Sequence, residues 1–208
     1  MSLEIHNLQV GFMSTNCYLA VNTGEHRLLI IDPGADAERI IRKADELEAE
    51  PAAILLTHGH FDHITAVDAV RKHYEIPVYA LKEEAEVLRD PAVNMSSRYG
   101  DEIVLDADGL LKDHETLTLA GLQVLCIHTP GHTCGGCCYY LPEEGVLFSG
   151  DTLFRGSVGR TDFPGGSTKE LIDSVHRLID ELPPETAVYP GHDLATTIGE
   201  EARYNPFV

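Results

Sequence analysis

A run of three histidines and one aspartate, set between an apolar stretch and a helical pattern, restricts the fold more than any other part of the chain. The run is Thr57-His58-Gly59-His60-Phe61-Asp62-His63; it follows the apolar residues 53–56 and precedes a helical pattern over 64–73. Ligand sites in open α/β sheets gather where strands end. The run therefore predicts a metal or substrate site at a sheet edge.

Three further residues occupy the same kind of position later in the chain. Each follows an apolar strand pattern and a turn that contains glycine: His132 after Pro130-Gly131, Asp151 after Ser149-Gly150, and His192 after Pro190-Gly191. A chain that leaves a strand and aims one side chain at a metal needs unusual backbone angles or a close approach, and glycine permits both. Four strand ends are thus expected to converge.

Apolar runs bounded by turn residues predict many strands and fewer helices. The expected strands are 4–10, 17–22, 27–31, 53–57, 78–80, 116–119, 122–128, 137–141, 146–149 and 187–189, and the expected helices are 37–47, 64–73, 81–88 and 169–182. Several strands follow one another without a helix, which favours mixed sheets with helices outside. We expect an α/β (α+β) fold, a four-layer αββα sandwich of two mixed sheets, with residues 90–113 as a long surface loop or insertion.

Length, charge and cysteine content exclude several classes of protein. The 208 residues are expected to form a single domain, 1–208, because nothing resembling a linker divides them. A formal net charge of −19 disfavours nucleic acid and anionic membranes as partners. No signal-peptide pattern or long apolar run appears, so we expect a cytoplasmic protein. Five cysteines, an odd number with three crowded at 134–138, do not form an evenly spaced disulfide framework, so we expect reduced thiols. We also expect a monomer or small homo-oligomer.

The residue types in the run indicate metal chemistry. Imidazole is the commonest side-chain ligand of zinc and also suits iron, whereas carboxylates bridge ions. In an extended segment His58 and His60 point the same way and can grip one ion, while Asp62 and His63 face a neighbouring position. Chance crowding of solvated histidines is the alternative, and the recurrence of strand, glycine turn and ligand argues against it.

The ordered pattern HxHxDH, then a lone histidine, an aspartate and a lone histidine resembles the metal signature of the metallo-β-lactamase superfamily, and especially its short glyoxalase II-like (hydroxyacylglutathione hydrolase-like) members. The resemblance also covers 150–154, 160–163 and 205–207. It implies two divalent cations, zinc or else iron or manganese, with His58, His60 and His132 around the first, Asp62, His63 and His192 around the second, and Asp151 as the bridge.

The resemblance implies hydrolysis of a small thioester, such as S-lactoylglutathione, by a hydroxide shared between the cations, with Asp62 and Asp151 in catalytic roles. Full-length glyoxalase II carries a C-terminal helical domain that this chain is expected to lack. A mononuclear iron persulfide dioxygenase is the alternative, and a phosphodiesterase or nuclease is less favoured by the acidic charge. A β-lactamase is also disfavoured, because β-lactamases commonly have Cys or Ser at the Asp151 position.

Other residues allow two interpretations each. Clustered bases at Arg155, Arg160 and Lys169 are candidates for binding a substrate carboxylate, or they form surface salt bridges. Asp32 either orients a ligand histidine from behind or forms an Asx turn. The Cys134–Cys137 spacing is typical of zinc or redox sites, but a structural zinc needs a second pair, which favours packing.

Overall fold

A six-stranded mixed sheet forms the N-terminal half of the protein. The computed structural model describes residues 3–208. In this first sheet the strand order is β1-β2-β3-β4-β5-β6, antiparallel between β1, β2 and β3 and parallel from β3 to β6. The strands are β1 (Leu3–Val10), β2 (Thr15–Asn22), β3 (Arg27–Ile31), β4 (Glu50–Leu55), β5 (Val78–Leu81) and β6 (Gly109–Leu111).

A second six-stranded mixed sheet, in the order β14-β13-β10-β9-β8-β7, comes from the C-terminal half. Only the β10–β13 pair is parallel. The strands are β7 (Thr116–Leu119), β8 (Leu122–His128), β9 (Cys137–Leu141), β10 (Val146–Gly150), β13 (Ala187–Pro190) and β14 (Thr196–Thr197), and a separate small hairpin consists of β11 (Leu153–Phe154) and β12 (Ser157–Val158).

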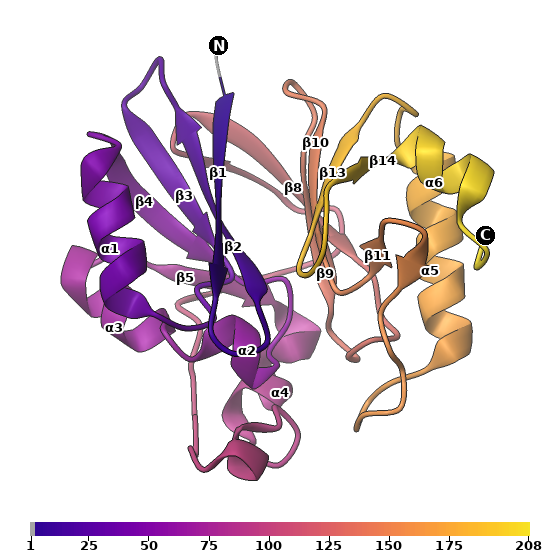
Figure 1. The fold of residues 1–208 in the computed structure, drawn as a ribbon, viewed down its shortest axis with the longest axis horizontal. Coiled ribbons are helices and arrows are strands. Elements are labelled where there is room, and N and C mark those ends of the chain that lie inside the picture. The colour runs from indigo at the N-terminus through magenta and orange to yellow at the C-terminus, as the bar shows by residue number, and fades with distance from the viewer. Residues whose placement is uncertain (1–2) are drawn as a thin grey trace.

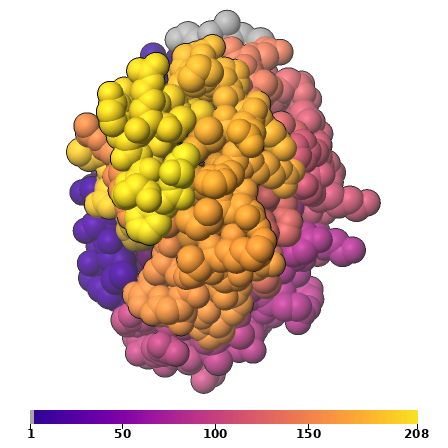
Figure 2. Space-filling model, turned by 90° about the vertical axis from the view of Figure 1, so that its right-hand side faces the viewer, coloured from indigo at the N-terminus to yellow at the C-terminus, as the bar shows by residue number. Residues whose placement is uncertain are grey.

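Helices cover the outer faces of the two sheets (Figure 1). The helices of the protein are α1 (Ala37–Glu46), α2 (Phe61–Ile64), α3 (Val67–Tyr74), α4 (Ala85–Arg89), α5 (Thr168–Glu181) and α6 (Ile198–Tyr204), with short 3-10 helices η1 (Lys82–Glu84) and η2 (Ser96–Tyr99). Helices α1 and α3 pack outside the first sheet, and α5 and α6 outside the second. Figure 2 shows α5 and α6, in orange and yellow, on the C-terminal face.

Side chains that alternate between the two faces of each sheet form three separate apolar layers. In β3, Leu28 and Ile30 pack toward helices α1 and α3, whereas Leu29 and Ile31 pack toward the second sheet. Successive side chains of a strand point to opposite faces, so one strand serves two layers when both faces are covered. The central layer contains Tyr139 and Phe148 from the second sheet. The expected four-layer αββα sandwich of two mixed sheets is therefore confirmed.

The fold differs from the expectation in local elements. Residues 90–113 are more ordered than a loop, because they contain η2 and the edge strand β6, which pairs in parallel with β5. The helix expected over 64–73 begins earlier and divides into α2 and α3. The short elements β11, β12, β14 and α6 were not predicted. Among residues 3–208, no helix is long and apolar enough to cross a membrane.

Candidate metal centre

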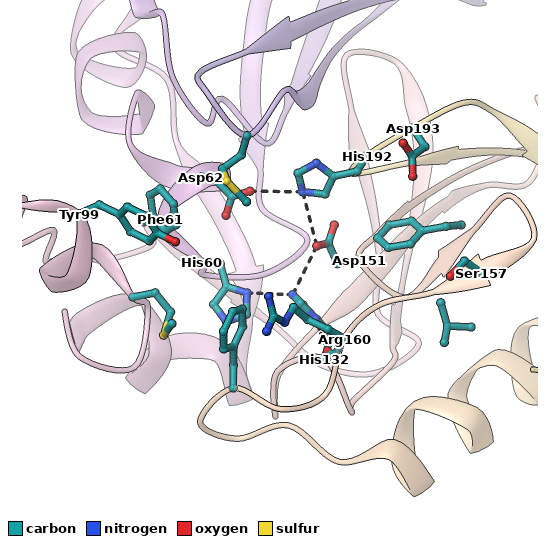
Figure 3. A pocket seen from close by; sticks show the side chains of 15 residues that line it. His60, Phe61, Asp62, Tyr99, His132, Asp151, Ser157, Arg160, His192 and Asp193 are labelled. Carbon is teal, nitrogen blue, oxygen red and sulfur yellow. Dashed lines mark hydrogen bonds and ion pairs between the residues drawn. The ribbon is translucent and has the colours of Figure 1, made fainter.

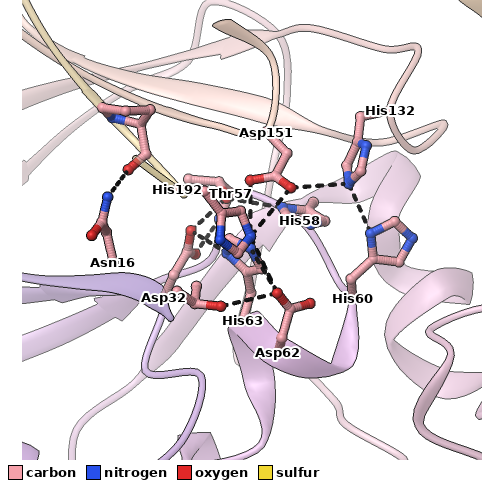
Figure 4. A network of polar contacts seen from close by, with 12 residues as sticks. Asn16, Asp32, Thr57, His58, His60, Asp62, His63, His132, Asp151 and His192 are labelled. Carbon is pink, nitrogen blue, oxygen red and sulfur yellow. Dashed lines mark hydrogen bonds and ion pairs between the residues drawn. The ribbon is translucent and has the colours of Figure 1, made fainter. Parts of the chain in front are cut away.

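Loops from both sheets converge at one edge of the sandwich (Figure 3, Figure 4). The loop after β4 and the short helix α2 supply four of the predicted ligands, and the ends of β8, β10 and β13 supply the others. The structure brings together all seven residues predicted to ligate metal: His58, His60, Asp62, His63, His132, Asp151 and His192.

Three imidazoles form the first half of the centre. The ligand atoms of His58, His60 and His132 all lie within 4.8 Å of one another. Nδ1 of His60 faces Nε2 of His132 at 2.8 Å, and all three residues are buried. A buried group of three nitrogen donors is the arrangement that zinc and other divalent transition metals prefer.

The second half combines two imidazoles with a carboxylate. Oδ2 of Asp62 lies 3.3 Å from Nε2 of His192 and 3.7 Å from Nε2 of His63. The hydroxyl of Thr15 donates a hydrogen bond of 2.9 Å to the same oxygen, which fixes the carboxylate from the β2 side. This half offers one oxygen and two nitrogen donors.

Asp151 contacts both halves. Its Oδ2 lies 3.5 Å from Nε2 of His132, a member of the first half, and 3.6 Å from Nε2 of His192, a member of the second. Its Oδ1 lies 3.5 Å from Nε2 of His63. The carboxylate therefore stands between the two sets of ligands, as a bridging residue requires.

Polar atoms left without partners show that these residues fit cations. Nε2 of His58, Nε2 of His63 and Oδ1 of Asp151 are buried and have no hydrogen-bond partner among the described residues. Burying an unpaired polar atom costs about 1–3 kcal/mol, so clustered examples are typical of a site that takes a ligand. Bound cations would satisfy all three atoms at once.

A polar chain behind the centre sets the orientation of two ligand histidines. Asp32 accepts hydrogen bonds from the Thr57 hydroxyl at 2.6 Å and from Nδ1 of His63 at 2.9 Å, and the same Thr57 oxygen lies 3.2 Å from Nδ1 of His58. With its Nδ1 proton engaged in this way, each imidazole in its neutral form presents an Nε2 lone pair to the centre. The hydrogen bond predicted from Asp32 to one of the candidate ligand histidines is therefore present.

The third imidazole of the first half is oriented by a backbone carbonyl. Nδ1 of His132 donates to the carbonyl oxygen of Arg160 at 2.7 Å. A carbonyl oxygen only accepts, so the proton is on Nδ1 and Nε2 is free to ligate.

The first half favours neutral imidazoles. Burial, together with the neighbouring histidines, lowers the pKa of His58 well below its usual value. Burial and His132 likewise lower the pKa of His60, to about 3, against an opposing effect of Asp62. Neutral imidazole is the ligating form, so this environment removes the proton that would compete with a cation.

The second half concentrates negative charge. Burial opposes protonation of His63, but Asp62, Asp151 and Asp32 together outweigh it and raise the pKa of His63 to about 10. Burial also opposes ionisation of Asp62, yet the charge of His63 and the contacts with His192 and Thr15 hold the pKa of Asp62 below its usual range. Such a site attracts positive charge.

The glycines before two of the ligands have the steric roles expected from the sequence. A Cβ on Gly191 would lie 2.3 Å from Oδ1 of Asp151, and one on Gly131 would lie 2.2 Å from the backbone nitrogen of Leu171. Gly131 also has a φ of 130°, which other residues rarely adopt. Both loops therefore approach their neighbours more closely than a side chain would permit.

A cavity of about 420 Å³ opens over the centre. Its walls are His60, Asp62, His132, Asp151 and His192 with Met13, Phe61, Met95, Tyr99, Phe154, Ser157, Val158, Arg160, Phe163 and Asp193. Of the three bases proposed to bind substrate, only Arg160 lies in this wall. It forms two hydrogen bonds of 2.7 Å to Asp162 and stacks 3.9 Å above the Phe163 ring.

The other two bases lie elsewhere. Arg155 lines a separate surface depression beside α6, and Lys169 is an exposed residue of α5 that pairs with Asp173. Their sequence proximity to Asp151 does not bring them to the cavity: Arg155 is exposed in the turn between β11 and β12, and Lys169 is exposed in the first turn of α5.

Sequence reasoning missed Glu84. This buried carboxylate accepts hydrogen bonds from the backbone nitrogen of Gly59 at 2.7 Å, the hydroxyl of Thr133 at 3.0 Å and the backbone nitrogen of Gly135 at 2.9 Å. Burial raises its pKa to about 7 against these three donors. The expected helix 81–88 contains three glutamates, Glu83, Glu84 and Glu86, and nothing in the sequence distinguishes Glu84 from the other two.

The cysteines take no part in the centre. All five thiols are free, and each except Cys134 is buried. Burial raises the pKa of Cys138 to about 12. Such a thiol is a packing residue at neutral pH.

The fold and the two ligand clusters define a divalent-metal-binding enzyme. The sequence matches the family described as the Metallo-beta-lactamase superfamily over residues 10–192. It is 36% identical to the hydroxyacylglutathione hydrolase GloC of Haemophilus influenzae over 214 residues, covering 100% of this chain and 98% of that protein. The chain therefore belongs to the metallo-β-lactamase superfamily.

Solved structures agree with this assignment. The BLEG-1 B3 metallo-beta-lactamase aligns with a TM-score of 0.92 at 45% identity, covering 98% of this chain and 99% of that one. The protein TTHA1623, in a di-iron-bound form, aligns with a TM-score of 0.86 at 40% identity, covering 98% of this chain and 100% of that one. The expected family and fold are thereby confirmed.

Proposed function

We propose that this protein hydrolyses small thioesters, S-acyl conjugates of glutathione or of another low-molecular-weight thiol, with two divalent cations at the candidate metal centre. The observation that carries the proposal is the position of Asp151, whose two oxygens face ligands of both halves. A carboxylate so placed suits a pair of cations. The 36% identity to a hydroxyacylglutathione hydrolase supports a thioester as substrate.

Cations held by these residues would supply the Lewis acidity that makes water nucleophilic near neutral pH. In the overall reaction, a water oxygen bonds to the thioester carbonyl carbon and the carbon–sulfur bond breaks. The products are a carboxylic acid and a thiol. A thiolate is a good leaving group, since a simple thiol has a pKa of about 8.5, and it needs little help from a protein acid.

The protein's own residues would orient the reactants. Asp62 has a pKa below its usual range, so it stays ionised at neutral pH and suits a ligand better than a lasting proton acceptor. Its second role would be to receive a water proton transiently and release it toward the leaving sulfur. The side chains of Phe61 and Tyr99 would limit water access on one side of the cavity.

Specific observations favour two other activities. The 45% identity to a B3 metallo-beta-lactamase makes β-lactam hydrolysis an alternative activity. The HxHxDH run is also compatible with a mononuclear iron persulfide dioxygenase, which would use two histidines and one aspartate. The contacts of Asp151 with both halves favour the two-cation alternative over a single iron.

One experiment distinguishes these activities. Protein purified without chelator is analysed for metals and then assayed on S-lactoylglutathione, on a chromogenic β-lactam, and for oxygen uptake with glutathione persulfide. We expect about two divalent ions per chain and thioester cleavage. One iron per chain with oxygen uptake, or turnover of the β-lactam alone, would contradict the proposal.

A further inference from the structure

A cluster of three aromatic rings borders the metal-centre cavity. The Phe61 and Tyr99 rings stack with centroids 4.2 Å apart, and Phe12 lies 5.9 Å from Phe61 and 5.5 Å from Tyr99. The rings come from α2, from the η2 segment and from the β1–β2 turn. Phe12 is 72% exposed and Tyr99 is 51% exposed. Exposed apolar surface of this kind, next to a polar site, marks a binding surface.

A second, smaller cavity of about 160 Å³ lies against these rings. It shares Met13, Phe61, Asp62 and Tyr99 with the cavity over the metal centre, so these four side chains border both cavities. Its remaining walls are mainly small or apolar: Val10, Gly11, Phe12, Gly34, Ala35, Thr65 and Asp101. An apolar cavity of about 150 Å³ is large enough to hold a benzene ring.

Charge determines which part of a thioester fits this cavity. Asp101 is the only charged side chain in its wall apart from Asp62, and the chain as a whole carries a net charge of −19. An anionic group would be repelled there. Across the main cavity from Phe61 and Tyr99 lie Ser157 and Asp193, which suit a polar group (Figure 3).

We propose that the aromatic cluster is an acyl-binding subsite for an uncharged, ring-sized apolar group. The inference rests on the proposed thioester hydrolysis and names the acyl half of its substrate. Phe61 links the subsite to the chemistry, because it lies between His60 of the first half and Asp62 of the second. A phenyl or comparably bulky acyl group would stack on Phe61 and Tyr99 while its carbonyl reaches the centre.

The test uses thioesters that share the uncharged thiol N-acetylcysteamine and differ in the acyl group. We expect kcat/KM for the phenylacetyl thioester to exceed that for the acetyl thioester by about tenfold or more, the range that apolar pockets achieve. The Tyr99→Ala variant should reduce this ratio to less than about threefold. Tyr99→Phe should retain it, and Tyr204→Ala, which removes an exposed tyrosine of α6, should leave it unchanged.

A third substrate distinguishes the two ends of the thioester. S-benzyl thioacetate carries the ring on the thiol side, and a preference for it over the phenylacetyl thioester would overturn the acyl assignment. Equal kcat/KM values for the phenylacetyl and acetyl substrates, or a ratio unaffected by Tyr99→Ala in a variant with wild-type metal content, would overturn the subsite itself.

A binding measurement separates failure of the subsite from failure of the proposed function. Calorimetric titration of the metal-loaded protein compares phenylacetate with acetate and requires no turnover. If neither thioester is cleaved but phenylacetate binds about tenfold more tightly, the thioester function fails and the apolar subsite stands. If both thioesters are cleaved at equal rates and the two acids bind equally, the function stands and the subsite fails.

Discussion

The carboxylate of Glu84 accepts a hydrogen bond from the backbone nitrogen of Gly59, the residue between two ligands of the first half. With its second oxygen it holds Thr133 and Gly135, which follow His132. One buried side chain therefore joins the loop of His58 and His60 to the loop of His132. The distances among these three imidazoles depend on that link.

We expect Glu84→Gln to weaken cation binding about tenfold or more, the cost typical of residues that support metal ligands. A glutamine can place its NH₂ group where the Glu84 oxygen now accepts from Thr133 and Gly135, so that buried donors face one another. A buried polar group left unpaired in this way costs about 1–3 kcal/mol. Competition with a chromogenic chelator measures the affinity. The exposed neighbour Glu83→Gln removes the same charge and is the control. Unchanged affinity in Glu84→Gln, with only a lower Tm, would restrict Glu84 to a structural role.

Asp151→Ala should lose cations from both halves, because the carboxylate contacts a ligand of each. We expect substoichiometric metal after dialysis and a loss of thioester cleavage of at least about 100-fold. Elemental analysis and the initial rate provide the two readouts. Asp173→Ala, on the outside of α5, is the matched control. If Asp151→Ala kept two ions and its activity, the bridge would be wrongly assigned.

The metal-free protein should lose stability as pH rises. The pKa of His63 is raised from 6.5 to about 10, so the stabilisation from its charged form is complete below about pH 6.5 and is lost as pH rises through 10. Each kcal/mol lost lowers Tm by about 2–4 °C in a protein of this size. Thermal unfolding of stripped protein between pH 7 and 10 measures the effect. His63→Gln should abolish the slope, whereas the exposed His73→Gln should not.

We expect Lys169 and Arg160, which were predicted together because they are close in sequence, to differ in their effect on the KM for substrate. Lys169→Ala should leave KM for S-lactoylglutathione unchanged within about twofold, because Lys169 lies outside the cavity wall. Arg160→Ala should raise KM, by less than about fivefold, because the guanidinium is already paired with Asp162 and exposed. A larger change for Lys169→Ala than for Arg160→Ala would show that the cavity seen here is not the binding site.

The strands, the sheet layers and the convergence of the seven candidate ligands could be predicted because each has a local signal. Alternating or continuous apolar runs identify strands such as β3, and the glycine turns identify where ligands leave the strands. Phe154 and Ser157 belong to the small hairpin β11–β12, which has strands of two residues and no such pattern. Its position is set by distant contacts, including the hydrogen bond from Gly156 to Glu201 of α6.

The supporting residues of the centre were harder to predict for the same reason. Asp32 was recognised because it ends a strand, but Glu84 is far from the ligands in sequence and reaches Gly59 only through the packing of η1. Tyr99 lies in a segment expected to be a loop, and its stacking on Phe61 depends on how residues 90–113 fold back. Sequence patterns report local periodicity, whereas these contacts are set by tertiary packing.

Because Asp151 contacts candidate ligands of both halves, the two ions of a loaded centre would be thermodynamically linked. Occupancy of one half changes the affinity of the other, and by reciprocity the factor is the same in either order of filling. A metal titration of the stripped protein should therefore depart from two independent isotherms, and the departure measures the coupling free energy that this single shared side chain transmits.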